Sequence, residues 1–205
     1  MEDDDRWRNK WIYLRTSIDY LVTYYQLIPD PTYGRNKVDP SDPTRRIPVD
    51  HAVRPWIGVS LGVEFHYLNW MSSELGFNLN FGDPMHNTLM PSLQIAQKFP
   101  LKPSKHFMIE PYLVASFLTT TSESASVPRF GAGGGVQLGV KGGDMGAFFV
   151  DANFIYTFGN VTQENKTNHY TLPSEIKYNR FVFAVGAGYK IGFLDRPKKA
   201  VPAPE

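Results

Sequence analysis

The sequence predicts an all-β protein, an eight-stranded antiparallel up-and-down transmembrane β-barrel. Three observations favour this fold class: apolar residues alternate with small or polar ones in about eight segments, long and short links alternate between them, and glycine fills the small face of several segments. The segments span roughly 9–13 residues, the length that a tilted strand needs to cross a bilayer. No run approaches roughly 18 consecutive apolar residues, so a transmembrane helix is not expected.

The first four segments alternate in the order of the chain. Residues 11–24 carry an imperfect pattern, and residues 56–67 the clearest one, with an apolar residue at every second position from Ile57. Residues 74–82 repeat that pattern. Residues 88–99 form the weakest segment, because a proline inside it is typical of a strand end or an edge strand.

The last four segments close the chain with more regular patterns. Residues 107–117 alternate loosely, and residues 129–141 oppose apolar side chains with a row of glycines. After the turn at residues 142–146, apolar positions recur up to Phe158, and residues 180–193 form the final strand. Because glycine is a poor strand former, its place along one whole face indicates that this face has little room for side chains.

The links predict how the strands are connected. The three links expected to be long and polar are residues 26–53, 118–128 and 160–178, and the three expected to be short are residues 69–73, 101–105 and 142–146. The link at residues 82–87 breaks the alternation. In an up-and-down meander this pattern gives one end with long loops and a trimmed end that carries both termini. The domain division is then a polar segment 1–10, a barrel 11–193 and a disordered tail 194–205.

Side-chain volume indicates which face points inward. An eight-stranded barrel has an interior just wide enough for side chains to fill, so glycine and small polar residues fit there and the large aromatic set does not. The glycines are therefore expected to face the lumen and the aromatic residues the lipid. The alternative is a soluble lipocalin-like ligand binder with its apolar face inward.

Charged residues on the inward face are mixed in sign, and buried charges need partners. The predicted lumen charge network comprises Arg15, Asp19, Glu64, Glu74, Glu110, Arg129, Lys141, Asp151, Arg180 and Lys190. Aromatic residues near strand ends are expected to form the interfacial girdles of a membrane barrel. These residues are Tyr24, Trp56, Tyr67, Trp70, Phe158 and Phe193.

The final strand resembles the closing strand of bacterial outer-membrane barrels. Gly188, Ile191 and Phe193 fit its pattern of a terminal aromatic residue with a glycine five positions before it, although Gly186 stands where a polar residue is usual and a tail follows. The resemblance implies that the barrel assembly machinery of the outer membrane reads this strand. The expected location is therefore the bacterial outer membrane, with the lipid bilayer as a partner. The start of the chain is polar and shows no signal peptide.

More closely, the chain resembles the OmpW-like small barrels over roughly residues 55–193. The positions that carry the resemblance are Thr88, Leu89 and Pro91, then Pro111, Tyr112 and Leu113, whereas Val114 stands where that family has glycine. The resemblance implies a narrow lumen whose apolar upper part lets small hydrophobic solutes leave sideways into the membrane. The inward apolar residues that could line such a lumen are Leu21, Val114, Phe149, Ile155 and Val182. The alternative is that they only pack a closed lumen.

Little else in the sequence indicates chemistry, and we expect no catalytic residue, cofactor or metal. No motif of a metalloprotease, phosphate loop or serine hydrolase is present. His66 lies close in sequence to Ser72 and Ser73, but a histidine that lines a turn is expected there and not a catalytic base. The absence of cysteine excludes disulfides and thiolate metal sites, and a net charge of +1 gives no case for nucleic acid. A solute conduit, a closed surface barrel whose long loops bind a partner, and a lipid-modifying enzyme remain, in that order.

Overall fold

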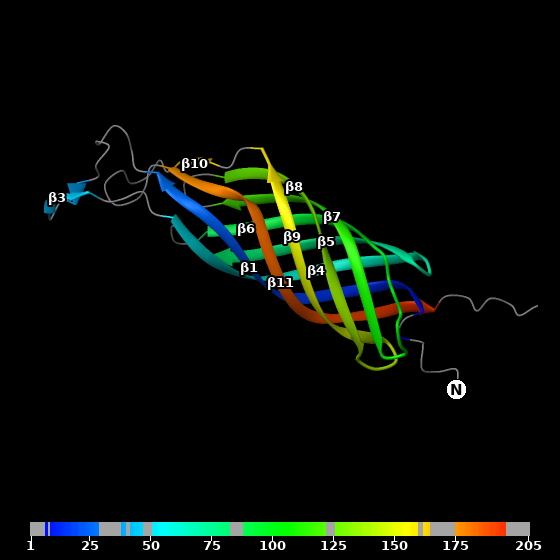
Figure 1. Cartoon of the computed structure of the whole chain (residues 1–205). Coiled ribbons are helices and arrows are strands. Elements are labelled where there is room, and N and C mark those ends of the chain that lie inside the picture. Colours follow the sequence, from blue (N-terminus) through cyan, green and yellow to red (C-terminus); the bar gives the residue numbers. More distant parts are fainter. Residues whose placement is uncertain are drawn as a thin grey trace, which may run out of the picture.

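Each barrel strand is hydrogen-bonded to the next along the chain, and the last strand returns to the first (Figure 1). The computed structural model describes residues 7, 9–28, 38–39, 42–46, 51–82, 88–121, 126–159, 162–164 and 175–195. The barrel strands are β1 (Lys10–Ile28), β4 (His51–Leu68), β5 (Met71–Gly82), β6 (Thr88–Lys98), β7 (Phe107–Thr121), β8 (Ser126–Lys141), β9 (Gly146–Phe158) and β11 (Glu175–Asp195). The predicted eight-stranded antiparallel barrel is confirmed.

Closure depends on the pairing of β1 with β11, which runs from Lys10 opposite Asp195 to Ile28 opposite Glu175. Because no strand edge of the barrel remains open, the backbone amide and carbonyl groups can be satisfied inside the wall, as a lipid environment requires. No helix among the described residues is long and apolar enough to cross a membrane.

The two ends of the barrel differ. The links after β4, β6 and β8 are short and lie at the end where β1 begins and β11 ends (Figure 1). We call this the lower end. At the opposite, upper end lie two small additions: β2 (Val38–Asp39) pairs with β3 (Asp42–Arg46), and β10 (Thr162–Glu164) extends the sheet beside β11.

The strands are longer at the upper end than the sequence predicted. Only β5, β6 and β9 have 11–13 residues, whereas β1, β4 and β11 have 19, 18 and 21. The ladder continues past the alternating segments, for example where Gln26 pairs with both His51 and Lys177.

The expected long link at residues 118–128 is wrong for most of its length. Residues 118–121 belong to β7 and pair with residues 126–129 of β8. A polar threonine- and serine-rich stretch can therefore form a two-stranded extension, because strand pairing needs only backbone partners. The proposed disordered tail begins at residues that belong to β11 and otherwise lies outside the described residues, as do most of the polar segment 1–10, the long links, His86 and His169.

The outer face of the wall is an apolar band, as predicted. Large hydrophobic side chains from every barrel strand are exposed there, and they include Leu14, Ile18, Ile57, Leu61, Leu75, Phe77, Leu93, Ile95, Leu113, Phe130, Phe148, Val150, Phe181 and Phe183. A surface of this kind is stable only against lipid or another apolar phase. The structure is therefore a transmembrane barrel, and the soluble lipocalin-like alternative is rejected.

Four of the six predicted girdle residues are exposed: Tyr67, Phe158 and Phe193 in the strands of the wall, and Trp70 in the turn between β4 and β5. Trp56 is a correction. Its side chain is only 1% exposed and points into the lumen, where its indole N–H donates to Thr23 Oγ1 at 2.7 Å. The strand alternation that places Ile57 outside requires its neighbour to face inside, so position in the ladder outweighs the aromatic character of the residue. The side chain of Tyr24 lies outside the described residues.

The glycine row of β8 makes room for large lumen side chains from neighbouring strands. A Cβ atom at Gly135 would lie 2.6 Å from both Cζ and Oη of Tyr112. That hydroxyl donates to Asp151 Oδ1 at 2.6 Å, so the missing side chain lets Tyr112 reach a partner across the interior. At Gly139 the nearest atoms to such a Cβ belong to Met108, at 3.8 Å or more.

We expect Gly135→Ala to lower the free energy of unfolding by about 1–3 kcal/mol, because the added methyl group would lie 2.5 Å from the Ala152 carbonyl oxygen and 2.6 Å from the end of the Tyr112 side chain. Gly139→Ala is the matched control on the same strand and should change it by less than about 0.5 kcal/mol. Urea titrations of protein refolded into lipid vesicles, followed by tryptophan fluorescence, measure both. Equal effects of the two substitutions would contradict this account of the glycine face.

Candidate functional site in the barrel lumen

The lower half of the lumen is filled by charged side chains from seven strands. We call this set the polar floor: Arg15 (β1), Glu64 (β4), Glu74 (β5), Lys98 (β6), Glu110 (β7), Asp151 (β9) and Lys190 (β11). All seven are buried. Each occupies an inward position of its strand, so the alternation of the wall delivers them to one layer from all around the barrel.

Arg15 joins two sides of the floor. Its guanidinium donates to Glu74 Oε1 at 2.9 Å and to Asp151 Oδ2 at 2.7 Å. The fork geometry of arginine suits two separate carboxylates, and the same group lies 4.6 Å from the centre of the Phe149 ring.

The two lysines complete the floor. Lys98 Nζ lies 2.5 Å from Glu74 Oε2 and 3.2 Å from Glu64 Oε2, and it also donates to Gln137 Oε1 at 3.0 Å. Lys190 Nζ lies 2.6 Å from Glu110 Oε2. A buried ion-pair network of this kind tolerates the loss of one member poorly, because the remaining charge is left without compensation.

The structure brings together six of the ten residues of the predicted charge network: Arg15, Glu64, Glu74, Glu110, Asp151 and Lys190. Asp19 is hydrogen-bonded instead to Ser17 and Ser60. The remaining three lie apart from the floor. Arg129 donates to Thr120 Oγ1 near the upper end, Arg180 donates to the Thr157 carbonyl, and Lys141 lies 3.9 Å from Asp144 beside a short link.

Sequence reasoning missed Lys98 as a member of the floor, and it missed the contacts that Gln137, Tyr112 and His66 make with floor residues. Lys98 lies in the weakest of the predicted strands, where only two firm apolar residues marked the faces. The sequence did contain the information that Lys98 faces the lumen, because in a strand it points to the side opposite to Leu93 and Ile95. Extending the alternation by one more step would have found it.

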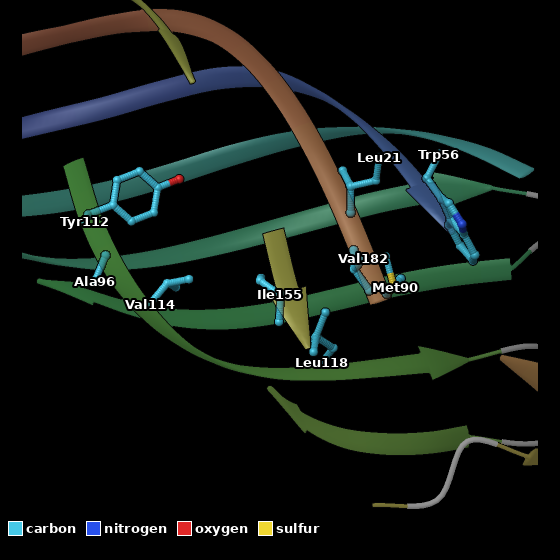
Figure 2. Packing of buried hydrophobic residues seen from close by; sticks show 9 residues of the cluster. All are labelled: Leu21, Trp56, Met90, Ala96, Tyr112, Val114, Leu118, Ile155 and Val182. Carbon is cyan, nitrogen blue, oxygen red and sulfur yellow. The ribbon is translucent and has the colours of Figure 1, made fainter. Parts of the chain in front are cut away.

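Above the floor lies an apolar layer, shown in Figure 2. It consists of Leu21, Trp56, Met90, Val114, Leu118, Ile155 and Val182, all buried in one cluster that also contacts Ala96 and Tyr112. On each contributing strand that also carries a floor residue, the apolar member lies nearer the upper end than the charged one. Four of the five predicted lining residues are in this layer. Phe149 is not, because it lies at the height of Arg15, under the guanidinium.

Little free space remains between the layers. A cavity of about 30 Å³ is lined from below by Arg15, Glu74, Lys98 and Asp151 and from above by Leu118, Ile155 and Val182, among others. That volume suits about two water molecules. An organic solute does not fit into this cavity without movement of the lining side chains.

The wall beside the apolar layer contains a break in the ladder. β6 and β7 pair at Leu89 with Thr121 and again at Ser92 with Leu118, but no pairing joins the two positions between them, Met90 and Pro91. Proline has no amide hydrogen, so it cannot donate to a neighbouring strand. On the lumen side the break is flanked by Met90 and Leu118, two members of the apolar layer.

The His66–Ser72 pairing does not form a nucleophile and base. Ser72 Oγ donates to Glu64 Oε1 at 2.8 Å, and His66 Nε2 contacts the same carboxylate. A hydrolase needs the imidazole against the hydroxyl, with the acid behind it. Here the carboxylate occupies the central position.

Comparisons with known proteins agree with the architecture. The outer membrane protein OprG from Pseudomonas aeruginosa is similar, with a TM-score of 0.56, 9% identity and coverage of 90% of this chain and 96% of that chain. The fold is that of an outer-membrane β-barrel. Two further barrels are reported at lower scores: Neisserial surface protein A (TM-score 0.49, 10% identity, 89% and 97% coverage) and the outer membrane protease OmpT from Escherichia coli (TM-score 0.39, 10% identity, 90% and 97% coverage). No family model and no curated protein matches this outer-membrane-type barrel.

We expect Lys98→Met to lower the free energy of unfolding by about 3–5 kcal/mol, because it removes the cation that Glu74 and Glu64 share. Of the floor's cations, Arg15 and Lys190 alone then face its buried carboxylates. Lys141→Met is the control, since its ion pair is partly exposed and should contribute about 0–1 kcal/mol. Urea titration in lipid vesicles compares the two variants with the wild type. A loss no larger in Lys98→Met than in Lys141→Met would show that the floor is not a coupled network.

Proposed function

We propose that this chain is a non-enzymatic, OmpW-like barrel of the bacterial outer membrane that passes small hydrophobic solutes from its upper lumen sideways into the lipid. The observation that carries the proposal is the apolar layer lying directly above a closed polar floor, beside a break in the wall. The floor would block passage along the barrel axis, whereas the apolar layer and the break would allow passage through the wall.

The axial route is blocked by the floor. Arg15 connects β1 to β5 and β9, and Lys98 and Lys190 connect β6 and β11 to the carboxylates of β4, β5 and β7. Opening an axial path would separate buried ion pairs, which costs several kcal/mol for each partner exposed without compensation. An apolar solute also gains nothing from entering a charged layer.

The lateral route has a lower barrier for an apolar solute. Met90 and Leu118 lie at the break in the ladder between β6 and β7, and the outer surface there faces lipid. Both side chains are flexible enough to change rotamer, methionine especially. A solute displacing them would move from the apolar layer into lipid without crossing the polar floor, although the buried guanidinium of Arg129 lies beside its path, 3.7 Å from Met90 Sδ.

The experiment measures two routes separately. Cells that express the barrel are tested for uptake of a small radiolabelled aromatic hydrocarbon, and the purified protein is tested for ionic conductance in planar bilayers. We expect faster uptake than in barrel-free cells and no steady conductance.

Pro91→Ala restores an amide hydrogen at the break, so it should seal the wall and reduce the added uptake severalfold. Pro111→Ala is the matched control, because Pro111 lies in β7 where pairing with β8 is continuous. A steady conductance, or equal uptake by wild type and Pro91→Ala, would contradict the lateral route.

The second candidate is a closed surface barrel whose long upper links bind a partner. The cavity of about 30 Å³ favours it, because the lumen is nearly full as it stands. Absence of both uptake and conductance, with binding that is lost when residues 29–50 are shortened, would support this function over the first.

A further inference from the structure

Two strands on opposite sides of the lumen bring a histidine and two glutamates together in the floor. Glu64 and His66 are neighbours on the inner face of β4, and Glu110 reaches them from β7. One ligand atom from each of the three lies within 4.8 Å of the others, and all three side chains are at most 1% exposed. Three donor atoms this close can bind one cation of first-row transition-metal size.

The carboxylate oxygens of this trio are divided between two directions. Oε2 of Glu110 accepts from Gln137 at 2.7 Å and from Lys190 at 2.6 Å, and Oε2 of Glu64 faces Lys98 and Lys190 at 3.2 and 3.5 Å. Oε1 of Glu64 instead contacts His66 Nε2. The ammonium groups of Lys98 and Lys190 thus hold the Oε2 atoms of the two glutamates. Hydrogen-bonding partners around a metal site orient its ligands in the same way.

Oε1 of Glu110 has no hydrogen-bond partner among the described residues, although the whole side chain is buried. An unsatisfied buried carboxylate oxygen is costly, and native structures leave few such atoms without water or an ion. This atom is therefore an independent sign that a ligand belongs beside it.

The charge balance of the lower lumen points the same way. Within the described part of the chain, five buried carboxylates lie in this half, on Asp19, Glu64, Glu74, Glu110 and Asp151, against three buried cations, on Arg15, Lys98 and Lys190. The other two buried cations are engaged elsewhere: Lys10 with Asp195, and Arg129 in the upper layer. With His66 in the neutral form that a metal ligand requires, two negative charges are in excess, and in a low-dielectric interior they require compensation.

We propose that Glu64, His66 and Glu110 bind a divalent transition-metal ion that joins β4 to β7 across the barrel floor. Two carboxylate oxygens and one imidazole nitrogen suit Zn²⁺ or Mn²⁺ better than Ca²⁺ or a thiolate-seeking metal. One divalent ion neutralises the excess charge and gives the free Glu110 oxygen a partner. The site is a structural clamp, and it does not depend on the proposed solute route.

The test begins with the full chain refolded into detergent in the presence of Zn²⁺, freed of unbound ion by gel filtration and analysed for metal content. We expect about one Zn²⁺ per chain, and at least a tenfold lower content in His66→Ala and in the nearly isosteric Glu110→Gln. His106→Ala is the matched control, since it removes an exposed histidine from a short link and should retain the ion.

Two measurements on the wild type keep the proposal testable if a variant fails to fold. Zn²⁺ should raise the temperature at which the folded band is lost on gels of heated samples, and a chelator present during refolding should abolish that rise. Co²⁺ in place of Zn²⁺ should give visible absorption bands of a nitrogen- and oxygen-ligated ion. No retained metal, or equal retention by wild type and His66→Ala, would overturn the site and indicate that bound protons balance the charge.

Discussion

The narrow interior of an eight-stranded wall is the constraint on which the rest of this structure depends. Closing β1 onto β11 satisfies the backbone in lipid, but it leaves an interior just wide enough for side chains. Large aromatic residues are therefore placed outside, where the bilayer accepts them. Inside, glycine makes room for some of the large side chains, as Gly135 does opposite Tyr112.

The same narrowness determines how the lumen carries charge. The cavity of about 30 Å³ beside the floor has room for about two water molecules, so the buried carboxylates depend mainly on side chains from other strands. Arg15, Lys98 and Lys190 supply those contacts, and each joins its own strand to at least one other. The floor thus both fills the lower lumen and connects the strands of the wall to one another through ion pairs.

Much of the wall could be predicted from the sequence because strand alternation is a local, period-two property. It placed the outer apolar band and the inward parity of Arg15, Glu64 and Glu110 correctly. It failed where a residue type was given more weight than parity: Trp56 was assigned to a lipid girdle, although its neighbour Ile57 faces out. Polarity misled in the same way at residues 118–128, since backbone pairing does not require an apolar face.

The site was harder to predict, because its contacts join distant strands. That Arg15 and not Arg129 meets Asp151 depends on the stagger of strands around the barrel, which no local pattern records. Lys98 shows the intermediate case: its inward direction was available from parity, but its partners Glu64 and Glu74 were not. Alternation along a strand tells whether a residue faces the lumen or the lipid. Its height in the barrel and its contacts across the lumen depend on how the strands pair around the closed wall.

The height of the charged floor limits where the wall of this barrel can lose a strand pairing. A charged layer that spans the interior must be held by continuous strands, and β6 pairs without interruption with β5 and β7 at the height of Lys98. Above the floor, where Met90 and Leu118 line the lumen beside Arg129, the ladder can lose a pairing at Pro91 without exposing an ion pair of the floor to lipid. The height of the break is therefore what would allow the wall to open for an apolar solute while the floor keeps ions from crossing.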